Sequence, residues 1–312
     1  MKPVILDVDT GIDDMMAIAY AAHSPELRLL GLTTQFGNIS SEVATRNTLY
    51  VLEMLGQGDV PVYAGASKPF RRADVLGDAK HVHGEDGLGG ALRGASPTGR
   101  AGSMTAAEFM VDQVRRMPGE ITIIAVGPLT NLALAIEADP EFVSLVDEVV
   151  IMGGAATVPG NVTPYAEANI HSDPEAAAFV FRSGLPITMV GLDVTMKTLL
   201  PRTRLQEWRS DGTELSRFMA DAADFYMDAY ENFNPGIGGC ALHDPLAVGV
   251  VIDPSFCKIV AMPIEVDTED GAPALGQTRV NETGTAAQSP SIHVCVEVDA
   301  ERFLAHFMSR VV

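Results

Sequence analysis

Short apolar runs alternate with amphipathic segments over the first two thirds of the chain. Such alternation is typical of βαβ units, in which helices cover a parallel sheet. The apolar runs predict strands near 3–8, 28–34, 120–126, 147–152 and 186–191. The amphipathic segments predict helices near 13–22, 41–55, 104–117, 130–138, 173–183 and 213–232. We therefore expect an α/β protein with a mostly parallel, Rossmann-like open sheet flanked by helices.

The last third of the chain has a different pattern. A helix is predicted to begin at Pro245, and strand-like segments follow at 258–266, 277–281 and 291–298. Their turn-rich connections favour an antiparallel extension of the sheet, and a last helix is predicted over 300–310. With 312 residues, of which 47% are apolar, the chain is long enough to form a large core. We expect a single domain over residues 1–312.

Long loops rich in glycine and proline interrupt this framework at 65–103, 153–171 and 233–244. Loops of this length in a compact domain are usually functional, and these contain many acids, amides and histidines. The third loop continues from the end of the preceding predicted helix. We expect the long loops 65–103, 153–171 and 220–243 to border the functional site.

Composition excludes several classes of partner. The formal net charge of −20 argues against binding to nucleic acid or to an anionic membrane, since both would be repelled. The three cysteines are widely spaced, which fits thiols in a reducing compartment. The apolar stretch at the amino terminus is too short for a signal peptide, and no run is long enough to span a bilayer. We expect a cytoplasmic protein with a small neutral or cationic substrate.

A group of carboxylates behind the first predicted strand is the strongest chemical signal. The sequence at 7–14 is DVDTGIDD, and it contains Asp7, Asp9, Asp13 and Asp14. Ligands bind at the carboxyl ends of strands in open α/β sheets, so these side chains can converge on one point. Their charges would repel one another without compensation. A hard divalent cation is the simplest compensation, because every available ligand atom in this run is an oxygen.

Helix capping is an alternative explanation for part of this segment. Thr10 and Asp13 have the spacing of a capping box, and an acid in the first helical turn is favoured by the helix dipole. Capping therefore explains Asp13 or Asp14. It does not explain Asp7 and Asp9, because a buried charge at a strand end is costly without a partner.

Six motifs, in sequence order, resemble those of the calcium-dependent nucleoside hydrolases of inosine-uridine type. They are DVDTGIDD at 7–14, GN at 37–38, HGEDG at 83–87, VGPLTN at 126–131, MGG at 152–154 with Asn161 and EAN at 167–169, and HDP at 243–245. The resemblance covers essentially the whole chain. It implies a mostly parallel α/β fold, hydrolysis of the N-glycosidic bond of ribonucleosides, one bound Ca²⁺, and a homodimer or homotetramer.

The resemblance also implies roles for single residues at the cation. The calcium ligands would be the carboxylates of Asp9, Asp14 and Asp244 and the backbone carbonyl of Val126. Asp13 would act as the base that takes a proton from a calcium-bound water attacking the anomeric carbon. Asp7 would lie behind the ligands and orient them. The alternative for Asp244 is a helix N-cap, because Pro245 follows it.

Further residues would contact the substrate. By resemblance these are Asn38, His83, Met152, Asn161, Glu167 and Asn169. Asn169 and Asp14 would hold the 2′- and 3′-hydroxyls, whereas Asn161 and Glu167 would take the 5′-hydroxyl. Met152 would pack beside the sugar. Asn38 alternatively serves only the turn after a strand, and His83 lies in a loop expected to close over the ribose.

The departing base needs a proton, and three residues are candidates for supplying it. His243 is the first candidate, although a histidine in a loop is often only a hydrogen-bonded loop residue. Tyr226 and Tyr230 lie one helical turn apart on the predicted helix and would matter more for pyrimidine substrates. Their alternative is a packed helix face.

Two other functions compete with nucleoside hydrolysis. A haloacid-dehalogenase-type phosphatase also begins with a strand that ends in Asp-x-Asp and uses Mg²⁺. That pattern has Thr or Val four residues after the first Asp, where this chain has Gly11, and it has no place for Asp13 and Asp14. A non-catalytic, calcium-dependent nucleoside-binding protein is the second alternative, and the presence of Asp13 argues against it.

Overall fold

The computed structural model of the protein describes residues 1–73, 78–281 and 291–311. Within them, the fold is built on one sheet with the strand order β10-β9-β11-β6-β5-β4-β1-β2-β3. The strands are β1 (Lys2–Val8), β2 (Leu27–Thr34), β3 (Val62–Ala64), β4 (Thr122–Ala125), β5 (Glu148–Met152), β6 (Ile187–Val190), β9 (Cys257–Val266), β10 (Thr278–Val280) and β11 (Ser291–Val298). The strands from β3 to β11 in this order are parallel, and β9 and β10 extend the sheet with antiparallel pairing. The predicted mostly parallel sheet with an antiparallel extension is confirmed.

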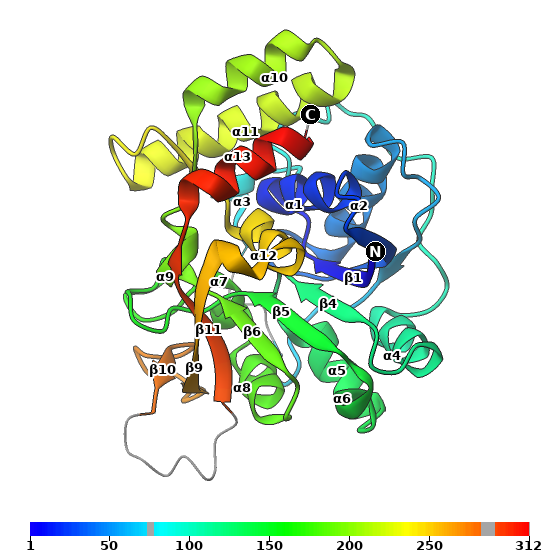
Figure 1. Ribbon diagram of the computed structural model, residues 1–312, viewed down its shortest axis with the longest axis vertical. Coiled ribbons are helices and arrows are strands. Elements are labelled where there is room, and N and C mark those ends of the chain that lie inside the picture. Colours follow the sequence, from blue (N-terminus) through cyan, green and yellow to red (C-terminus); the bar gives the residue numbers. More distant parts are fainter. Residues whose placement is uncertain (74–77, 282–290, 312) are drawn as a thin grey trace.

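Helices cover both faces of the sheet (Figure 1). One face carries α1 (Ile12–Ala22), α2 (Ser41–Met54), α12 (His243–Ile252) and α13 (Ala300–Val311). The other face carries α4 (Ala106–Arg116), α5 (Thr130–Ala138), α6 (Phe142–Leu145) and α8 (Pro174–Arg182). Each face packs into its own apolar core, because the central strands are buried on both sides.

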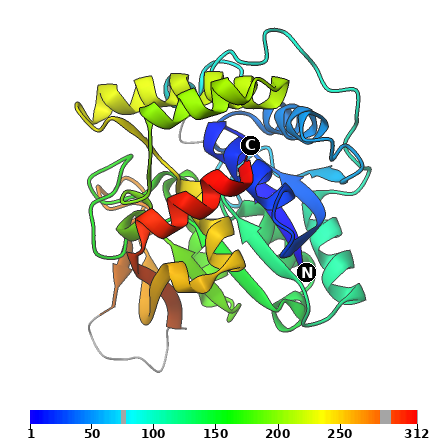
Figure 2. The ribbon, with the colours of Figure 1, turned by 45° about the horizontal axis from the view of Figure 1, so that its top comes forward.

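An outer layer of helices covers the first of these faces. It contains α10 (Leu205–Asp211) and α11 (Glu214–Phe233), which run side by side above α1 and α13 (Figure 2). A separate antiparallel pair, β7 (Leu199–Pro201) and β8 (Gly239–Ala241), joins the two ends of this layer. The remaining short elements are α3 (Lys80–His83), α7 (Ala168–Ser172), α9 (Leu192–Thr195), η1 (Arg202–Arg204) and η2 (Pro254–Phe256).

The position of β1 in the sheet determines where the carboxylates gather. The chain proceeds from β1 to β2 and β3 on one side, and then returns to β4 on the other side of β1. The carboxyl end of β1 therefore lies at the point where the strand order reverses. Ligands bind at such a point in open α/β sheets, because the loops on its two sides leave a crevice.

Two buried helices begin at this edge. Every residue of α1 from Ile12 to Ala21 is buried, and so are the residues of α12 from His243 to Val251. The two helices pack against each other, with α1 over β2 and α12 over β5 and β4. A helix that is apolar on all sides packs inside a core. The acids in the first turns of α1 and α12 therefore lie at this edge of the sheet and not on the outer surface.

The predicted long elements agree with the structure, and the differences lie at boundaries and in short elements. α12 begins at His243, two residues before the predicted start. The segment 220–243 is not a loop, because α11 continues to Phe233 and β8 follows at Gly239. The sequence did not predict β3, β7, β8, α9 or α10, which are too short to show a hydrophobic period. Among the described residues, no helix is long and apolar enough to cross a membrane.

Candidate active site and cation site

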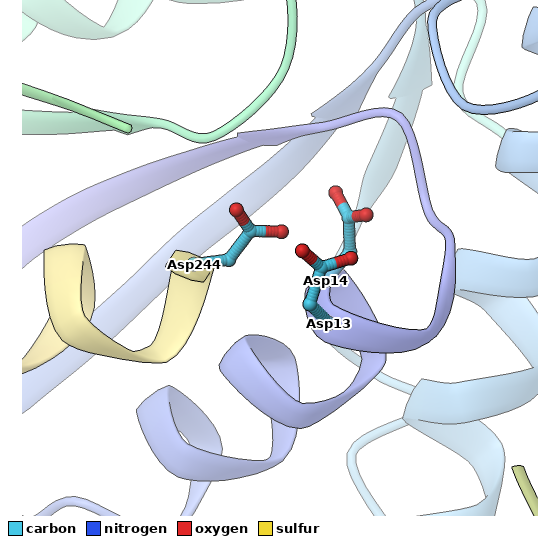
Figure 3. Close-up of side chains that lie close together, drawn as sticks. All are labelled: Asp13, Asp14 and Asp244. Atoms are coloured by element: carbon cyan, nitrogen blue, oxygen red, sulfur yellow. The ribbon is translucent and has the colours of Figure 1, made fainter. Parts of the chain in front are cut away.

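Three carboxylates from two helices meet beyond the carboxyl end of β1. Asp13 and Asp14 lie in the first turn of α1, and Asp244 lies in the first turn of α12 (Figure 3). Each contributes an oxygen atom that lies within 4.8 Å of the others. All three side chains are buried, with Asp13 the most exposed at 6%. Residues that are more than two hundred positions apart in the sequence thus form one acidic cluster.

The cluster has unused oxygen atoms, as a cation site requires. Within the described residues, Asp9 Oδ1, Asp13 Oδ1 and Asp244 Oδ2 are buried and accept no hydrogen bond. Burial and mutual repulsion raise the pKa of Asp9 and Asp244 well above the usual range, and burial chiefly raises the pKa of Asp14 to about 7. A hard cation would offset this cost, and the donor set consists of oxygens only.

Asp9 is held beside the cluster by its backbone and its side chain. Its N–H donates to Asp14 Oδ1 over 3.0 Å, and its Oδ2 accepts from the N–H of Asn38 over 2.6 Å. Gly37 and Gly127 enclose the carboxylate; a Cβ atom at position 127 would lie 2.8 Å from Asp9 Oδ1. Asp9 is not part of the group of three carboxylates within 4.8 Å, but it lies next to Asp14.

The capping alternatives for the acids are only partly right. Gly11 is the N-cap of α1, and its N–H donates to Asp14 Oδ2 over 2.8 Å, so Asp14 rather than Asp13 completes the cap. The hydroxyl of Thr10 bonds instead to that of Thr48 at 2.6 Å. Asp244 caps no helix, because α12 begins one residue earlier and Leu242 is its N-cap.

Asp7 lies behind the cluster in a network of hydrogen bonds. Thr33 Oγ1, Gln35 Nε2 and Asn131 Nδ2 donate to its carboxylate over 2.6, 2.8 and 2.8 Å. Gln35 also donates to the carbonyl of Pro128. Burial raises the pKa of Asp7 to about 7, although these donors favour the charged form. The network joins β1, β2 and the start of α5, and it braces the loop that follows β4.

Asn169 connects the carbonyl of Val126 with β5. Its Nδ2 donates to the carbonyl oxygens of Val126 and Met152 over 2.8 and 3.1 Å. A carbonyl oxygen has two lone pairs, so the hydrogen bond leaves Val126 able to bind a cation as well. The side chain of Met152 also contacts Asn169, with Sδ 3.4 Å from Nδ2.

Glu167 and Asn161 have different environments. The carboxylate of Glu167 is buried and accepts three backbone hydrogen bonds, from Asn169, Gly154 and Ile170 at 2.8, 2.9 and 3.1 Å. Glu167 is thus the N-cap of α7 and also holds Gly154. Asn161 is exposed, and its Oδ1 accepts from the N–H of Ala168 over 3.0 Å.

Two rings border Asp13. His83 Nδ1 lies 3.9 Å from Asp13 Oδ1, and its ring packs against that of Tyr226 with centroids 5.2 Å apart. Tyr226 Oη donates to Asp13 Oδ2 over 3.1 Å. Burial lowers the pKa of His83 to about 3 and raises the pKa of Tyr226 well above its usual value. Both rings are therefore neutral at physiological pH.

His243 is bonded at both ring nitrogens. Its Nε2 lies 2.6 Å from Tyr230 Oη, and its Nδ1 lies 2.7 Å from Thr195 Oγ1. Burial lowers the pKa of His243, while the charge of Asp13 opposes that shift. The rings of Tyr226 and Tyr230 are also in contact, with centroids 4.9 Å apart. Contacts therefore run without a break through Asp13, Tyr226, Tyr230, His243 and Thr195.

The structure thus places most of the predicted site residues around the acids that follow β1. Asn161 is the exposed exception, at the end of its loop. Gln35 and Thr195 were not predicted from the sequence. Gln35 directly follows β2, and that position at a strand end is the signal that could have identified it. Thr195 is the last residue of the short helix α9 and carries no such signal.

Comparison with known proteins gives consistent results. The family model described as "Inosine-uridine preferring nucleoside hydrolase" matches residues 4–305. A probable uridine nucleosidase 2 of Arabidopsis thaliana is 40% identical over 99% of this chain and 97% of its own length. A pyrimidine-specific ribonucleoside hydrolase of Citrobacter koseri is 37% identical over 97% of this chain and 95% of its own length. The solved structure of a purine-preferring ribonucleoside hydrolase from Gardnerella vaginalis superposes with a TM-score of 0.93 and 40% identity, covering 99% of this chain and 98% of that one.

Proposed function

This chain belongs to the inosine-uridine preferring nucleoside hydrolase family, and we propose from its site how it breaks the N-glycosidic bond of a ribonucleoside. The phosphatase alternative is therefore wrong. The observation that carries the proposal is the set of buried acids at the end of β1, with unpaired oxygens on Asp9, Asp13 and Asp244. Neither capping nor an ion pair between the described residues accounts for those oxygens.

We propose that the cation is Ca²⁺ and that this chain supplies four ligand residues. They are Asp9, Asp14 and Asp244 through their carboxylates and Val126 through its carbonyl. When bound, Ca²⁺ would supply positive charge that polarises a water molecule and ribose hydroxyls. The buried, all-oxygen donor set supports this choice over softer metals.

Asp13 is the proposed general base. Tyr226 occupies its Oδ2, so its free Oδ1 is the atom that can take the proton from the attacking water. The hydrogen bond from Tyr226 also fixes the direction of the carboxylate. The negative charge of the cluster would stabilise the positive charge that develops on the sugar as the C–N bond breaks.

His243 is the proposed acid for the departing base, with Tyr226 and Tyr230 as the alternatives. The contact between His243 Nε2 and Tyr230 Oη supports this group of residues, because it gives a path along which a proton can be replaced after transfer. The proton donor would be the imidazolium form of His243, which the charge of Asp13 favours although burial lowers the pKa of this ring.

The ribose would lie between the acids and the loop that follows β5. Asn169 and Asp14 are proposed for the 2′- and 3′-hydroxyls, and Asn161 and Glu167 for the 5′-hydroxyl. Met152, Asn38 and His83 would border the sugar. The relatives include enzymes named for uridine, for pyrimidines and for purines, so we propose a ribonucleoside substrate without selecting the base. We also propose a homodimer or homotetramer.

Release of free ribose from inosine and uridine tests this function. The wild-type protein should release ribose from at least one of them, and treatment with a calcium chelator should abolish that release until Ca²⁺ is restored. A generic phosphate ester should stay intact. Ribose release that persists after complete removal of divalent cations would contradict the calcium site while leaving the hydrolase activity in place.

A further inference from the structure

The segment that follows β5 is held by a threonine from the antiparallel extension of the sheet. Thr278 Oγ1 accepts a hydrogen bond from the N–H of Ala155 over 2.7 Å and donates to the carbonyl of the same residue over 3.0 Å. Thr278 is the first residue of β10 and is buried. The Thr278 side chain thus bonds both the N–H and the carbonyl of Ala155, which fixes the backbone at that residue.

A buried aspartate holds the next two residues. The carboxylate of Asp193, in α9, accepts hydrogen bonds from the N–H groups of Ala156 and Thr157 at 2.9 and 2.8 Å, and from the hydroxyl of Thr157 at 2.6 Å. Hydrogen bonds to a charged acceptor are stronger than those between neutral groups. Asp193 lies outside the acidic cluster and has no assigned part in the chemistry.

The close approach of these residues depends on glycine. Gly154 has a φ of +83°, and a Cβ atom there would lie 3.0 Å from Met189 Sδ and 3.1 Å from Thr278 Cγ2. A Cβ atom at Gly191 would lie 2.7 Å from the carbonyl oxygen of Gly154. The loop therefore packs directly on β6, α9 and β10, and no side chain larger than glycine fits at these two positions.

The far end of the same loop also rests on β10. Ala166 forms an antiparallel bridge with Gln277, the residue just before β10. The carbonyl of Ala166 accepts from the N–H groups of Asn161 and Val162 at 3.2 and 3.3 Å, which closes the turn that carries Asn161. β10 and the residue before it thus hold the loop 153–171 at both its beginning and its end.

We propose that Thr278 and Asp193 are positioning residues for the 5′-hydroxyl of the ribose. The inference rests on the proposed role of Asn161 and Glu167 in binding that hydroxyl. Glu167 accepts from the N–H of Gly154 at 2.9 Å, so the backbone that Thr278 and Asp193 fix is directly joined to Glu167. β10, at the edge of the sheet, and α9 would thereby set how well the enzyme recognises the 5′ end of its substrate.

The test compares a ribonucleoside with its 5′-deoxy analogue. Wild type and variants are assayed with uridine or inosine, whichever is hydrolysed faster, and with the 5′-deoxy form of the same nucleoside. Thr278→Val removes the hydroxyl but keeps the shape of the side chain. Thr278→Ser keeps the hydroxyl and serves as the rescue variant. Asp193→Asn leaves a single acceptor oxygen for the donors of Ala156 and Thr157.

A matched control exists in β4. Thr122 is buried, and its hydroxyl has no partner among the described residues, so Thr122→Val makes the same chemical change without loss of a hydrogen bond. We expect Thr278→Val to lower kcat/KM for the 5′-hydroxyl substrate about tenfold while the 5′-deoxy analogue changes less than about twofold, as loss of hydrogen bonds predicts. Asp193→Asn should act in the same direction, and Thr278→Ser and Thr122→Val should resemble wild type.

The outcomes separate this proposal from the function on which it rests. An equal fall for both substrates, or no fall for either, would overturn the positioning role. A wild-type enzyme that hydrolyses both substrates equally well would instead show that the 5′-hydroxyl is not bound, which contradicts the role of Asn161 and Glu167. Absence of ribose release from every nucleoside would contradict the hydrolysis itself.

Discussion

His83 Nδ1 accepts a hydrogen bond from the backbone N–H of Ile12 at 3.0 Å. An atom that accepts a hydrogen bond carries no proton, so the imidazole is neutral, with its proton on Nε2. The first residue of α1 thus sets the tautomer of a histidine seventy positions later in the chain.

Gly11→Ala tests this relationship. A Cβ atom at position 11 would lie 2.5 Å from His83 Nδ1, so the ring must move and its hydrogen bond with Ile12 must break. Misplacement of a substrate contact by about 1 Å can lower activity on the order of a hundredfold, and we expect kcat/KM for the preferred ribonucleoside to fall by that order. Gly58→Ala is the control, because a Cβ atom there meets only Glu53 Cγ at 3.8 Å. Similar kinetics for the two variants would contradict the role of His83.

Asp13→Asn tests the proposed base. An amide cannot take up the proton from water, so kcat should fall by several orders of magnitude, whereas substrate affinity should change little. The measurements are steady-state kinetics and, for affinity, calorimetric titration with the substrate. Near-normal turnover would rule out Asp13 as the base, and loss of affinity without loss of kcat would assign it to binding.

Single substitutions at His243, Tyr226 and Tyr230 identify the acid for the departing base. His243→Ala should lower kcat for inosine and uridine by a factor of about a hundred or more, as expected for removal of a general acid. A riboside with a nitrophenolate leaving group needs no proton and should be hydrolysed nearly as well as by wild type. If natural substrates are unaffected by His243→Ala, the Tyr226→Phe and Tyr230→Phe variants decide between the tyrosines.

The dependence of stability on Ca²⁺ should increase with pH. Asp14 has a folded-state pKa of about 7, whereas an unfolded chain has about 3.9. Because the folded-state pKa is the higher one, Asp14 contributes to the stability of the cation-free protein below pH 4. This contribution is lost as the pH rises through 7. A bound cation removes this loss. Thermal unfolding at pH 5 to 8 should therefore show a growing rise of Tm on addition of Ca²⁺.

The same experiment has a control and a clear contrary result. Asp244→Asn removes one charge from the cluster, which should weaken the effect of Ca²⁺ on Tm at every pH. A Tm rise that shrinks toward pH 8, or one that Asp244→Asn leaves intact, would contradict a site built from these carboxylates.

Thr122→Val should stabilise the fold. The hydroxyl of Thr122 is buried in β4 with no partner among the described residues, and a buried polar group without a hydrogen bond costs about 1 to 3 kcal/mol. Valine has nearly the same shape. Chemical denaturation should give a free energy of unfolding higher by about 1 kcal/mol, with unchanged activity. A lower value would indicate a bound water that satisfies this hydroxyl.

The sequence predicted those parts of the site that depend on local patterns. Asp9, Asp13 and Asp14 follow a strand and begin a helix, and both features are visible within a dozen residues. Their meeting with Asp244 depends on how α1 packs against α12, and only the resemblance to a family brought the two segments together. The long buried elements were predictable for the same local reason.

Other features require knowledge of tertiary contacts. Glu167 is the cap of a helix of five residues, which is too short to leave a periodic pattern. The expected loop over 220–243 was wrong because it overlapped the helix predicted over 213–232, which α11 confirms, and because β8 forms only by pairing with the distant β7. Thr195 bonds His243 because α9, which ends at Thr195, lies against α12.

Tyr226 and Tyr230 belong to α11, which lies outside the sheet, whereas Asp13, Asp14 and Asp244 begin the two innermost helices. Tyr226 bonds Asp13 directly, and His243 and His83 also contact the tyrosines of α11. A displacement of α11 would therefore move the two hydroxyl groups that hold Asp13 and His243. The outermost helix of the molecule is thus coupled directly to residues that begin its innermost helices.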